Sequence, residues 1–330
     1  QGEAAHFTLG NLNNDIGVPQ TLLRLRDAHR LSVVELGMNH PGEIAQLAAM
    51  AQPTVALVNN AQREHQEFMG TVEAVARENG AVLAALPANG VAVFPAHDAY
   101  SALWQNLAGQ RPCMRFSSEV HANSPAEVQL RSAQWGQGAW QVCAQTPAGE
   151  LHVALHIAGR HNVGNALAAT ACALAAGVSL EHVVLGLQDF RPVQGRSRAF
   201  ALSCGRAEVT VVDDTYNANP DSVRAAIEVL AELPAPQLLV LGDMGEVGSQ
   251  GPAFHREVGS HAHARGIAHV LCLGELAQHS AQACPGATHF ADIDALNQQV
   301  LKLLPHVGSV LVKGSRFMKM ERVVQALSLI

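Results

Sequence analysis

The feature that most constrains this sequence is an alternation of short β-branched runs with segments of helical periodicity. Strands separated by helices return in parallel, because each helical crossover covers one face of the sheet. Beyond residue 200 the pattern predicts a Rossmann-like, doubly wound α/β domain, whose ligands bind at the carboxyl ends of the strands. Its expected strands lie near 208–213, 237–242, 268–273 and 308–313, and its expected helices near 220–232, 251–265, 292–304 and 317–328.

The first half of the chain predicts a second α/β region that carries a β subdomain. We expect strands at 31–37, 54–60 and 90–96, helices at 40–52 and 71–86, and a long Ala-rich helix over 162–177. Short alternating runs between 113 and 157, separated by turn residues, indicate antiparallel strands. A Pro/Gly/Arg-rich stretch at 189–200 is the best boundary, so we expect one domain over 1–190 and another over 191–330.

Composition excludes several classes of protein. A net charge of −7 and only 4% aromatic residues disfavour a nucleic-acid binder. No apolar run has the length of a membrane span. The six cysteines lie far apart without a C-x-x-C pair, which indicates reduced thiols in a cytoplasmic protein, and we expect a monomer.

One polar corner, "VVDDTYNANPDSV" at 211–223, follows the first predicted strand of the second domain. Asn219 and Pro220 suit the start of a helix. Capping leaves Asp214, Tyr216 and Asn217 unexplained, and a flat ring beside an amide suits a base or a sugar. From these residues alone, ligand binding and helix capping remain equal alternatives.

Two further strands of that domain end in polar residues, namely Gly242-Asp243 and Lys313-Gly314-Ser315-Arg316. The glycine spacing before Lys313 is not that of a phosphate-binding P-loop. A cation and a hydroxyl at a strand end can still hold a carboxylate. Three polar strand ends on one edge predict a ligand site there.

Polar residues also follow predicted strands in the first half. Glu35 and His65, if they lie on adjacent strand ends, suit a divalent cation such as Mg²⁺, although each alone is more often an ordinary loop residue. Asn162 and Asn165 share one face of the Ala-rich helix. Capping accounts for Asn162, whereas Asn165 leaves recognition of adenine as an alternative.

Eight segments together resemble the Mur ligases of peptidoglycan synthesis, and they span almost the whole chain in family order. The branch that joins D-alanyl-D-alanine to UDP-N-acetylmuramoyl-tripeptide is the most similar, because "NNDIGVP" and "DDTYNANPDS" occur together. A folylpolyglutamate-synthase-like ligase and a non-catalytic nucleotide- or partner-binding module remain the alternatives. The segments are "GNLNNDIGVPQTLLRL", "ELGMNHPGEI", "NNAQREH", "GRHNVGNALAA", "VQGRSR", "DDTYNANPDS", "LGDMGEVG" and "VKGSRFMKME".

The resemblance implies an ATP-dependent carbon–nitrogen ligase of cell-wall synthesis, and hence of cell shape and division. ATP phosphorylates the peptide carboxylate, and the amine of D-alanyl-D-alanine attacks the resulting acyl phosphate. Catalytic roles fall to Arg196 and Lys313. The other implied contacts are Glu35 and His65 with Mg²⁺; Asn162, Asn165, Asp214, Tyr216 and Asn217 with ATP; and Asn13, Asn14 and Ser315 with the substrates.

Two departures from the family pattern affect these expectations. The chain shows neither the family's N-terminal uridine-nucleotide domain nor its G-x-x-G-K-[ST] loop, so we expect a truncated piece that cannot ligate alone. Many Mur ligases carry a carbamylated lysine where this chain has Asn79. Asparagine forms no carbamate, so the second Mg²⁺ is held differently or a neighbour such as Glu78 substitutes.

Overall fold

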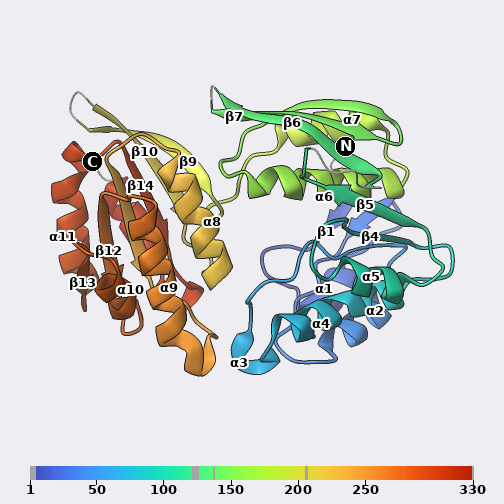
Figure 1. The fold of residues 1–330 in the computed structure, drawn as a ribbon. Helices are drawn as coiled ribbons and strands as arrows, with labels where there is room; N and C mark the ends of the chain where they lie inside the picture. The colour runs from blue at the N-terminus through green and yellow to red at the C-terminus, as the bar shows by residue number, and fades with distance from the viewer. Residues whose placement is uncertain (1–4, 121–125, 137, 205–206, 329–330) are drawn as a thin grey trace. The chain divides into compact units, whose positions relative to one another are not determined.

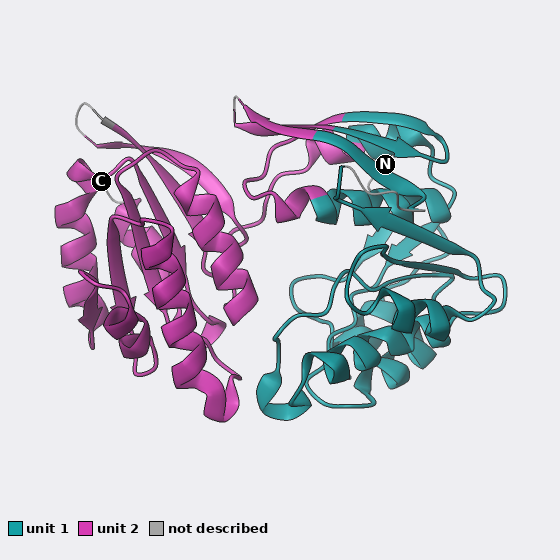
Figure 2. Cartoon of the chain, in the orientation of Figure 1, with its two compact units in different colours: residues 1–132, 143–152, 164–185 teal, residues 133–142, 153–163, 186–330 magenta. Residues whose placement is uncertain are grey.

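The computed structural model describes residues 5–120, 126–136, 138–204 and 207–328. The chain folds into two compact units (Figure 2). Both units contain β-sheets and α-helices, which confirms the predicted α/β class (Figure 1). The first unit comprises residues 1–132, 143–152 and 164–185, and the second comprises residues 133–142, 153–163 and 186–330.

The first half contains a six-stranded sheet that is parallel at one side and antiparallel at the other. Consecutive pairs from β3 to β6 are parallel. Only two residues separate β6 from β7 and β7 from β8, too few for a parallel crossover, so these neighbours are antiparallel. The prediction of an antiparallel region from 113 was therefore wrong at its first strand. In order, the strands are β3 (Val55–Leu57), β4 (Val91–Pro95), β5 (Cys113–Ser117), β6 (Val128–Gly136), β7 (Ala139–Thr146) and β8 (Gly149–Leu155).

Helices with apolar faces form a core with the parallel strands. Trp104 is completely buried there, and its indole Nε1 donates to the Ala76 carbonyl oxygen at 2.9 Å. Both predicted helices of this region are confirmed as α2 (Glu43–Ala51) and α4 (Val72–Ala84), and the Ala-rich helix as α6 (His161–Ala175). Three further helices of this region were not predicted, namely α3 (Gln66–Met69), α5 (Ser101–Ala108) and α7 (Leu180–Asp189).

A separate two-stranded parallel sheet lies near the N-terminus. It pairs β1 (Ala5–Phe7) with β2 (Leu31–Val33), and helix α1 (Gly17–Leu22) lies between them in the chain. The strand predicted over 31–37 thus ends at Val33, before Glu35. Among the described strands, β2 pairs with β1 while β3 pairs with β4, so Glu35 and His65 do not follow adjacent strands of one sheet.

The C-terminal part confirms the predicted doubly wound sheet. Its four expected strands are β10 (Ala207–Asp214), β11 (Gln237–Gly242), β12 (His269–Leu273) and β14 (Ser309–Lys313), all parallel. Two edge strands were not predicted: β9 (Arg198–Cys204), antiparallel to β10, and β13 (Thr288–Phe290). The sheet order is β13-β12-β11-β14-β10-β9. Its helices are α8 (Pro220–Ala231), α9 (Gly251–Ala264), α10 (Ala277–Ala283), α11 (Ile293–Leu303) and α12 (Glu321–Leu327).

Successive residues of the central strands pack into two separate cores, one on each face of the sheet. Val212 on β10 packs into the core that contains Ile227 of α8 and Val258 of α9. Its neighbour Val211 packs into the opposite core, with Leu296 of α11. Burial on both faces explains why these strands are continuous apolar runs, and why polar residues gather where the strands end. None of the helices in the described ranges is long and apolar enough to cross a membrane.

Candidate active site

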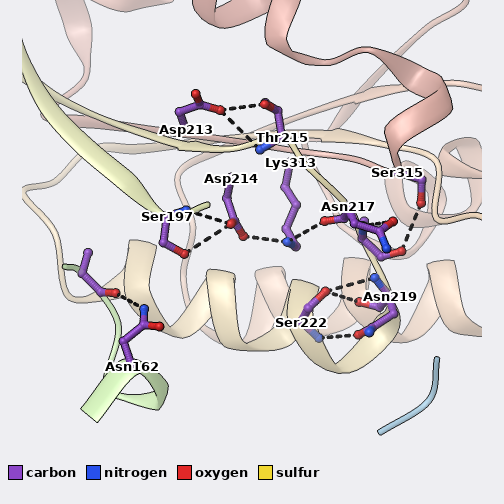
Figure 3. A network of polar contacts seen from close by, with 12 residues as sticks. Asn162, Ser197, Asp213, Asp214, Thr215, Asn217, Asn219, Ser222, Lys313 and Ser315 are labelled. Atoms are coloured by element: carbon purple, nitrogen blue, oxygen red, sulfur yellow. Dashed lines mark hydrogen bonds and ion pairs between the residues drawn. The ribbon is translucent and has the colours of Figure 1, made fainter. Parts of the chain in front are cut away.

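The polar corner 211–223 connects β10 to α8 (Figure 3). Asn219 accepts a hydrogen bond from Ser222 N at 2.7 Å, while Asn219 N donates to Ser222 Oγ at 3.0 Å. This capping box, with Pro220 in the first turn, confirms the capping interpretation for the second half of the corner. The side chains of Asp214, Tyr216 and Asn217 take no part in it.

An ion pair joins the corner to the neighbouring strand. Asp214 and Lys313 are register partners at the carboxyl ends of β10 and β14. Lys313 Nζ donates to Asp214 Oδ2 at 2.6 Å and to the Asn217 carbonyl oxygen at 2.9 Å. The Lys313 side chain is only 4% exposed and the Asp214 side chain 16%. This pair therefore fixes the corner's backbone as well as its charge.

The segment before β9 lies against the same corner. Gly195 N donates to Asp213 Oδ2 at 3.0 Å, and Ser197 donates from its backbone N and its Oγ to Asp214 Oδ1 at 3.0 and 3.2 Å. Asp213 also accepts from Thr215 Oγ1 at 2.7 Å. Sequence reasoning missed Gly195, Ser197 and Thr215. Gly195 in "VQGRSR" was the available signal, because glycine readily adopts the positive φ found there; Ser197 also lies at positive φ, which a serine does not indicate.

The exposed Arg196 contacts the half-buried Tyr216. The guanidinium carbon lies 4.1 Å from the centroid of the tyrosine ring. Tyr216 N donates to the Gly195 carbonyl oxygen at 3.0 Å, which holds the ring beside the arginine. A cation over an aromatic face makes a flat, positively charged surface, which suits an anionic ligand with a planar group.

The other two polar strand ends are largely occupied by internal contacts. Ser315 is 3% exposed, accepts from Gly245 N at 2.7 Å and donates to the Ala218 carbonyl oxygen at 3.1 Å. Asp243 is 7% exposed and accepts from Ala277 N, at the start of α10, at 2.7 Å. The carboxylate thus stabilises that helix. Both side chains brace the loops that follow β11 and β14.

The two asparagines of α6 make different contacts. Asn162 Nδ2 donates to the Ala158 carbonyl oxygen at 2.7 Å, a contact that fixes the segment entering the helix. Asn165 is exposed, and its Oδ1 accepts from Asn59 Nδ2 at 2.8 Å. The loop after β3 therefore reaches Asn165, a contact that sequence spacing did not predict.

Glu35 is exposed and lies beside two other predicted site residues. Its Oε1 accepts from Asn13 Nδ2 at 2.9 Å, and its backbone N donates to Thr8 Oγ1 at 2.9 Å. Asn14 Oδ1 accepts from Gly17 N at 2.9 Å, at the start of α1. The structure thus links Asn13 to Glu35 directly, whereas the side-chain oxygen of Asn14 contributes to a local turn.

His65 lies in a cluster that contains the position of the missing lysine. Its backbone has a φ of 50°, a left-handed conformation at the start of α3. Asn79 Nδ2 donates to Glu64 Oε1 at 3.4 Å. Desolvation raises the pKa of Glu64, while His65 and Asn79 act in the opposite direction. Glu78 is not available to this cluster, because its carboxylate accepts from Gly42 N and Ile44 N, both at 2.8 Å.

Family comparisons agree with the sequence motifs. The Mur ligase middle domain matches residues 1–173, and the Mur ligase glutamate ligase domain matches residues 198–316. The UDP-N-acetylmuramoyl-tripeptide–D-alanyl-D-alanine ligase of Escherichia coli K12 is 41% identical over 97% of this chain and 70% of its own length. The ligase of that name from Haemophilus influenzae Rd is 38% identical over 98% and 70%.

Solved structures lead to the same family. A crystal structure of MurF from Acinetobacter baumannii has a TM-score of 0.90 and 32% identity, over 99% of this chain and 71% of that chain. A folylpolyglutamate synthase from Mycobacterium tuberculosis has a TM-score of 0.68 at 17% identity, which shows a shared fold alone. The chain belongs to the Mur ligase family.

Proposed function

We propose that this protein is an ATP-dependent ligase of peptidoglycan precursor synthesis that joins D-alanyl-D-alanine to UDP-N-acetylmuramoyl-tripeptide. The relatives at 41% and 38% identity carry that activity in their names. The observation that carries the proposal here is the corner after β10, at the carboxyl edge of the sheet, where the buried Lys313 holds Asp214 and the Asn217 backbone, and the Gly195 carbonyl oxygen holds Tyr216. The protein acts as a cytoplasmic monomer, and its six free cysteines suit that reducing compartment.

The nucleotide would lie on the corner itself. Tyr216 offers a ring face for the base, and Asp214 offers a carboxylate for ribose hydroxyls. Asn217 is exposed, and its Oδ1 accepts from Ala218 N at 2.8 Å, which holds the amide in place. We assign Asn162 and Asn165 to the adenine, as the family resemblance implies.

Arg196 and Lys313 supply the positive charge that would neutralise the phosphates and carboxylates of the substrates. Arg196 would contact phosphate or the acceptor carboxylate from its position over Tyr216. Lys313 donates hydrogen bonds to Asp214 and to the Asn217 carbonyl oxygen, so its charge acts from a fixed, buried position. With Ser315 it supports the loop that we assign to the incoming dipeptide. We assign Asn13 and Asn14 to the muramoyl peptide.

The residues proposed to hold Mg²⁺ match its preference for oxygen ligands only in part. Among the described residues, the exposed Glu35 carboxylate accepts a side-chain hydrogen bond from Asn13 through Oε1, so Oε2 remains for a cation. His65 offers one nitrogen and Glu64 beside it a second carboxylate, but the ligand atoms of these two residues and Glu35 do not all lie within 4.8 Å of one another among the described residues. When bound, Mg²⁺ neutralises charge on the transferred phosphate.

Ligand binding to this chain tests the proposal. Calorimetric titrations should show binding of ADP in the presence of Mg²⁺ and of D-alanyl-D-alanine, and none of free glutamate. Glutamate binding in preference to the dipeptide would favour the folylpolyglutamate-synthase alternative. Binding of neither nucleotide nor dipeptide would contradict the proposal and favour a non-catalytic module.

A further inference from the structure

Three potential metal ligands meet on the hairpin of β7 and β8, in a part of the chain that the proposed function does not use. They are Cys143 on β7, and Glu150 and His152 on β8. One ligand atom from each lies within 4.8 Å of the others, and this is the one such group of three or more found among the described residues.

The hairpin itself creates the arrangement. Pro147 and Ala148 form a two-residue turn, so counting back from Thr146 and forward from Gly149 places Cys143 opposite His152. Glu150 lies two residues before His152, hence on the same face of the sheet. The side chains at 142, 144, 151 and 153 are buried, which leaves the three ligands on the outer face.

Glu150 connects the two other side chains. Cys143 Sγ donates to Glu150 Oε1 at 3.3 Å, and His152 Nε2 lies 3.2 Å from Glu150 Oε2. The histidine and glutamate side chains are 67% and 55% exposed, so both can rotate and an ion can reach them from solvent. Ligand atoms of a tetrahedral zinc site lie about 3.5 Å apart. The three side chains are therefore close to the spacing that such an ion requires.

We propose that Cys143, Glu150 and His152 form a binding site for Zn²⁺ or a similar thiophilic divalent cation. Sulfur, imidazole nitrogen and carboxylate oxygen are the three ligand types that Zn²⁺ takes from proteins, and water supplies the fourth position. Coordination forms a sulfur–metal bond and releases the thiol proton to solvent. Thiolate and carboxylate then balance the two charges of the ion. Because the ligands come from both strands, the ion cross-links β7 to β8 at the edge of the sheet.

Cobalt provides the direct test, because a cysteine–cobalt bond gives a charge-transfer absorption that histidine and carboxylate cannot give. We expect one equivalent of Co²⁺ to produce this absorption in the reduced, metal-free chain, and one equivalent of Zn²⁺ to abolish it. Cys143→Ser should remove the band. His152→Gln should weaken Zn²⁺ binding by more than the 10- to 100-fold typical of losing an outer-sphere partner.

Two variants separate this site from others on the chain. Cys113→Ser removes another half-buried thiol and should leave the band intact. His65→Ala alters the proposed Mg²⁺ site and should also leave it intact. Burial raises the pKa of the Cys172 and Cys272 thiols to about 12, and burial together with Glu150 also raises that of Cys143, but among the described cysteines only Cys143 has two further potential ligands beside it. Circular dichroism verifies that each variant is folded. Absence of the band, or its survival in Cys143→Ser, would overturn the proposal.

Discussion

Replacing Lys313 by Met should destabilise the C-terminal sheet strongly. The substitution keeps the length of the side chain but leaves Asp214, 16% exposed, without its cation, and the Asn217 carbonyl oxygen without a donor. Removing one partner of a buried ion pair typically costs about 3–5 kcal/mol. Ser197 still donates twice to Asp214 Oδ1, so we expect the lower end, about 3 kcal/mol. That cost corresponds to a roughly hundredfold larger opening equilibrium of the sheet.

Hydrogen exchange measured by mass spectrometry is the suitable assay, because Trp104, Trp135 and Trp140 all precede the C-terminal sheet and do not report on it. Amides of β10 and β14 should exchange faster by that factor. The ion pair Arg224–Glu257 is the matched control. Its Nη1 and Oε1 atoms are 3.0 Å apart, but its side chains are 44% and 32% exposed. Its Arg224→Ala variant should cost no more than about 1 kcal/mol.

A double-mutant cycle isolates the pair itself. Asp214→Asn should be destabilising alone, and the combination with Lys313→Met should cost less than the sum of the two, with a coupling of about 2 kcal/mol. A Lys313→Met cost no larger than that of Arg224→Ala would refute the argument that this ion pair holds the corner.

Three further results follow from local geometry. Asn219→Ala should destabilise α8 by about 1 kcal/mol through loss of its cap, measured as faster exchange of its first-turn amides. Gly195→Ala should weaken ADP binding in calorimetry, because φ is +80° there and a Cβ would lie 3.2 Å from Tyr216 N. Burial lowers the pKa of His255 in the folded chain. Below about pH 6.5 the unfolded chain therefore binds more protons than the folded one, so the free energy of unfolding decreases as the pH falls through that value. His255→Gln should flatten that pH dependence in denaturant titrations, and an unchanged slope would assign it to other histidines.

The doubly wound sheet was predictable because its central strands are buried on both faces. Such strands are continuous apolar runs bounded by polar residues, as at Val211 and Val212. Edge strands carry a weaker signal. β9 begins with the polar Arg198 and alternates in exposure, and β13 has three residues, so neither stands out from a loop.

Candidate site residues could be proposed from the sequence one by one, whereas their contacts could not. Asp214 and Lys313 are 99 positions apart, and only the parallel pairing of β10 with β14 makes them neighbours. Likewise, the link of Asn13 to Glu35 depends on a close approach between the loop after β1 and the end of β2. Strand order is set by packing over the whole sheet, which local periodicity does not record.

Titration of ADP into the chain and its Tyr216→Leu variant tests the central claim, that the corner after β10 holds the nucleotide. Tyr216 is half-buried, and leucine keeps its apolar contacts while removing the ring face that stacks with Arg196. We predict that the wild-type chain binds ADP and that the variant binds it at least about tenfold more weakly, a difference of about 1.4 kcal/mol. Equal affinity of the two folded proteins would contradict the assignment of this corner to the nucleotide.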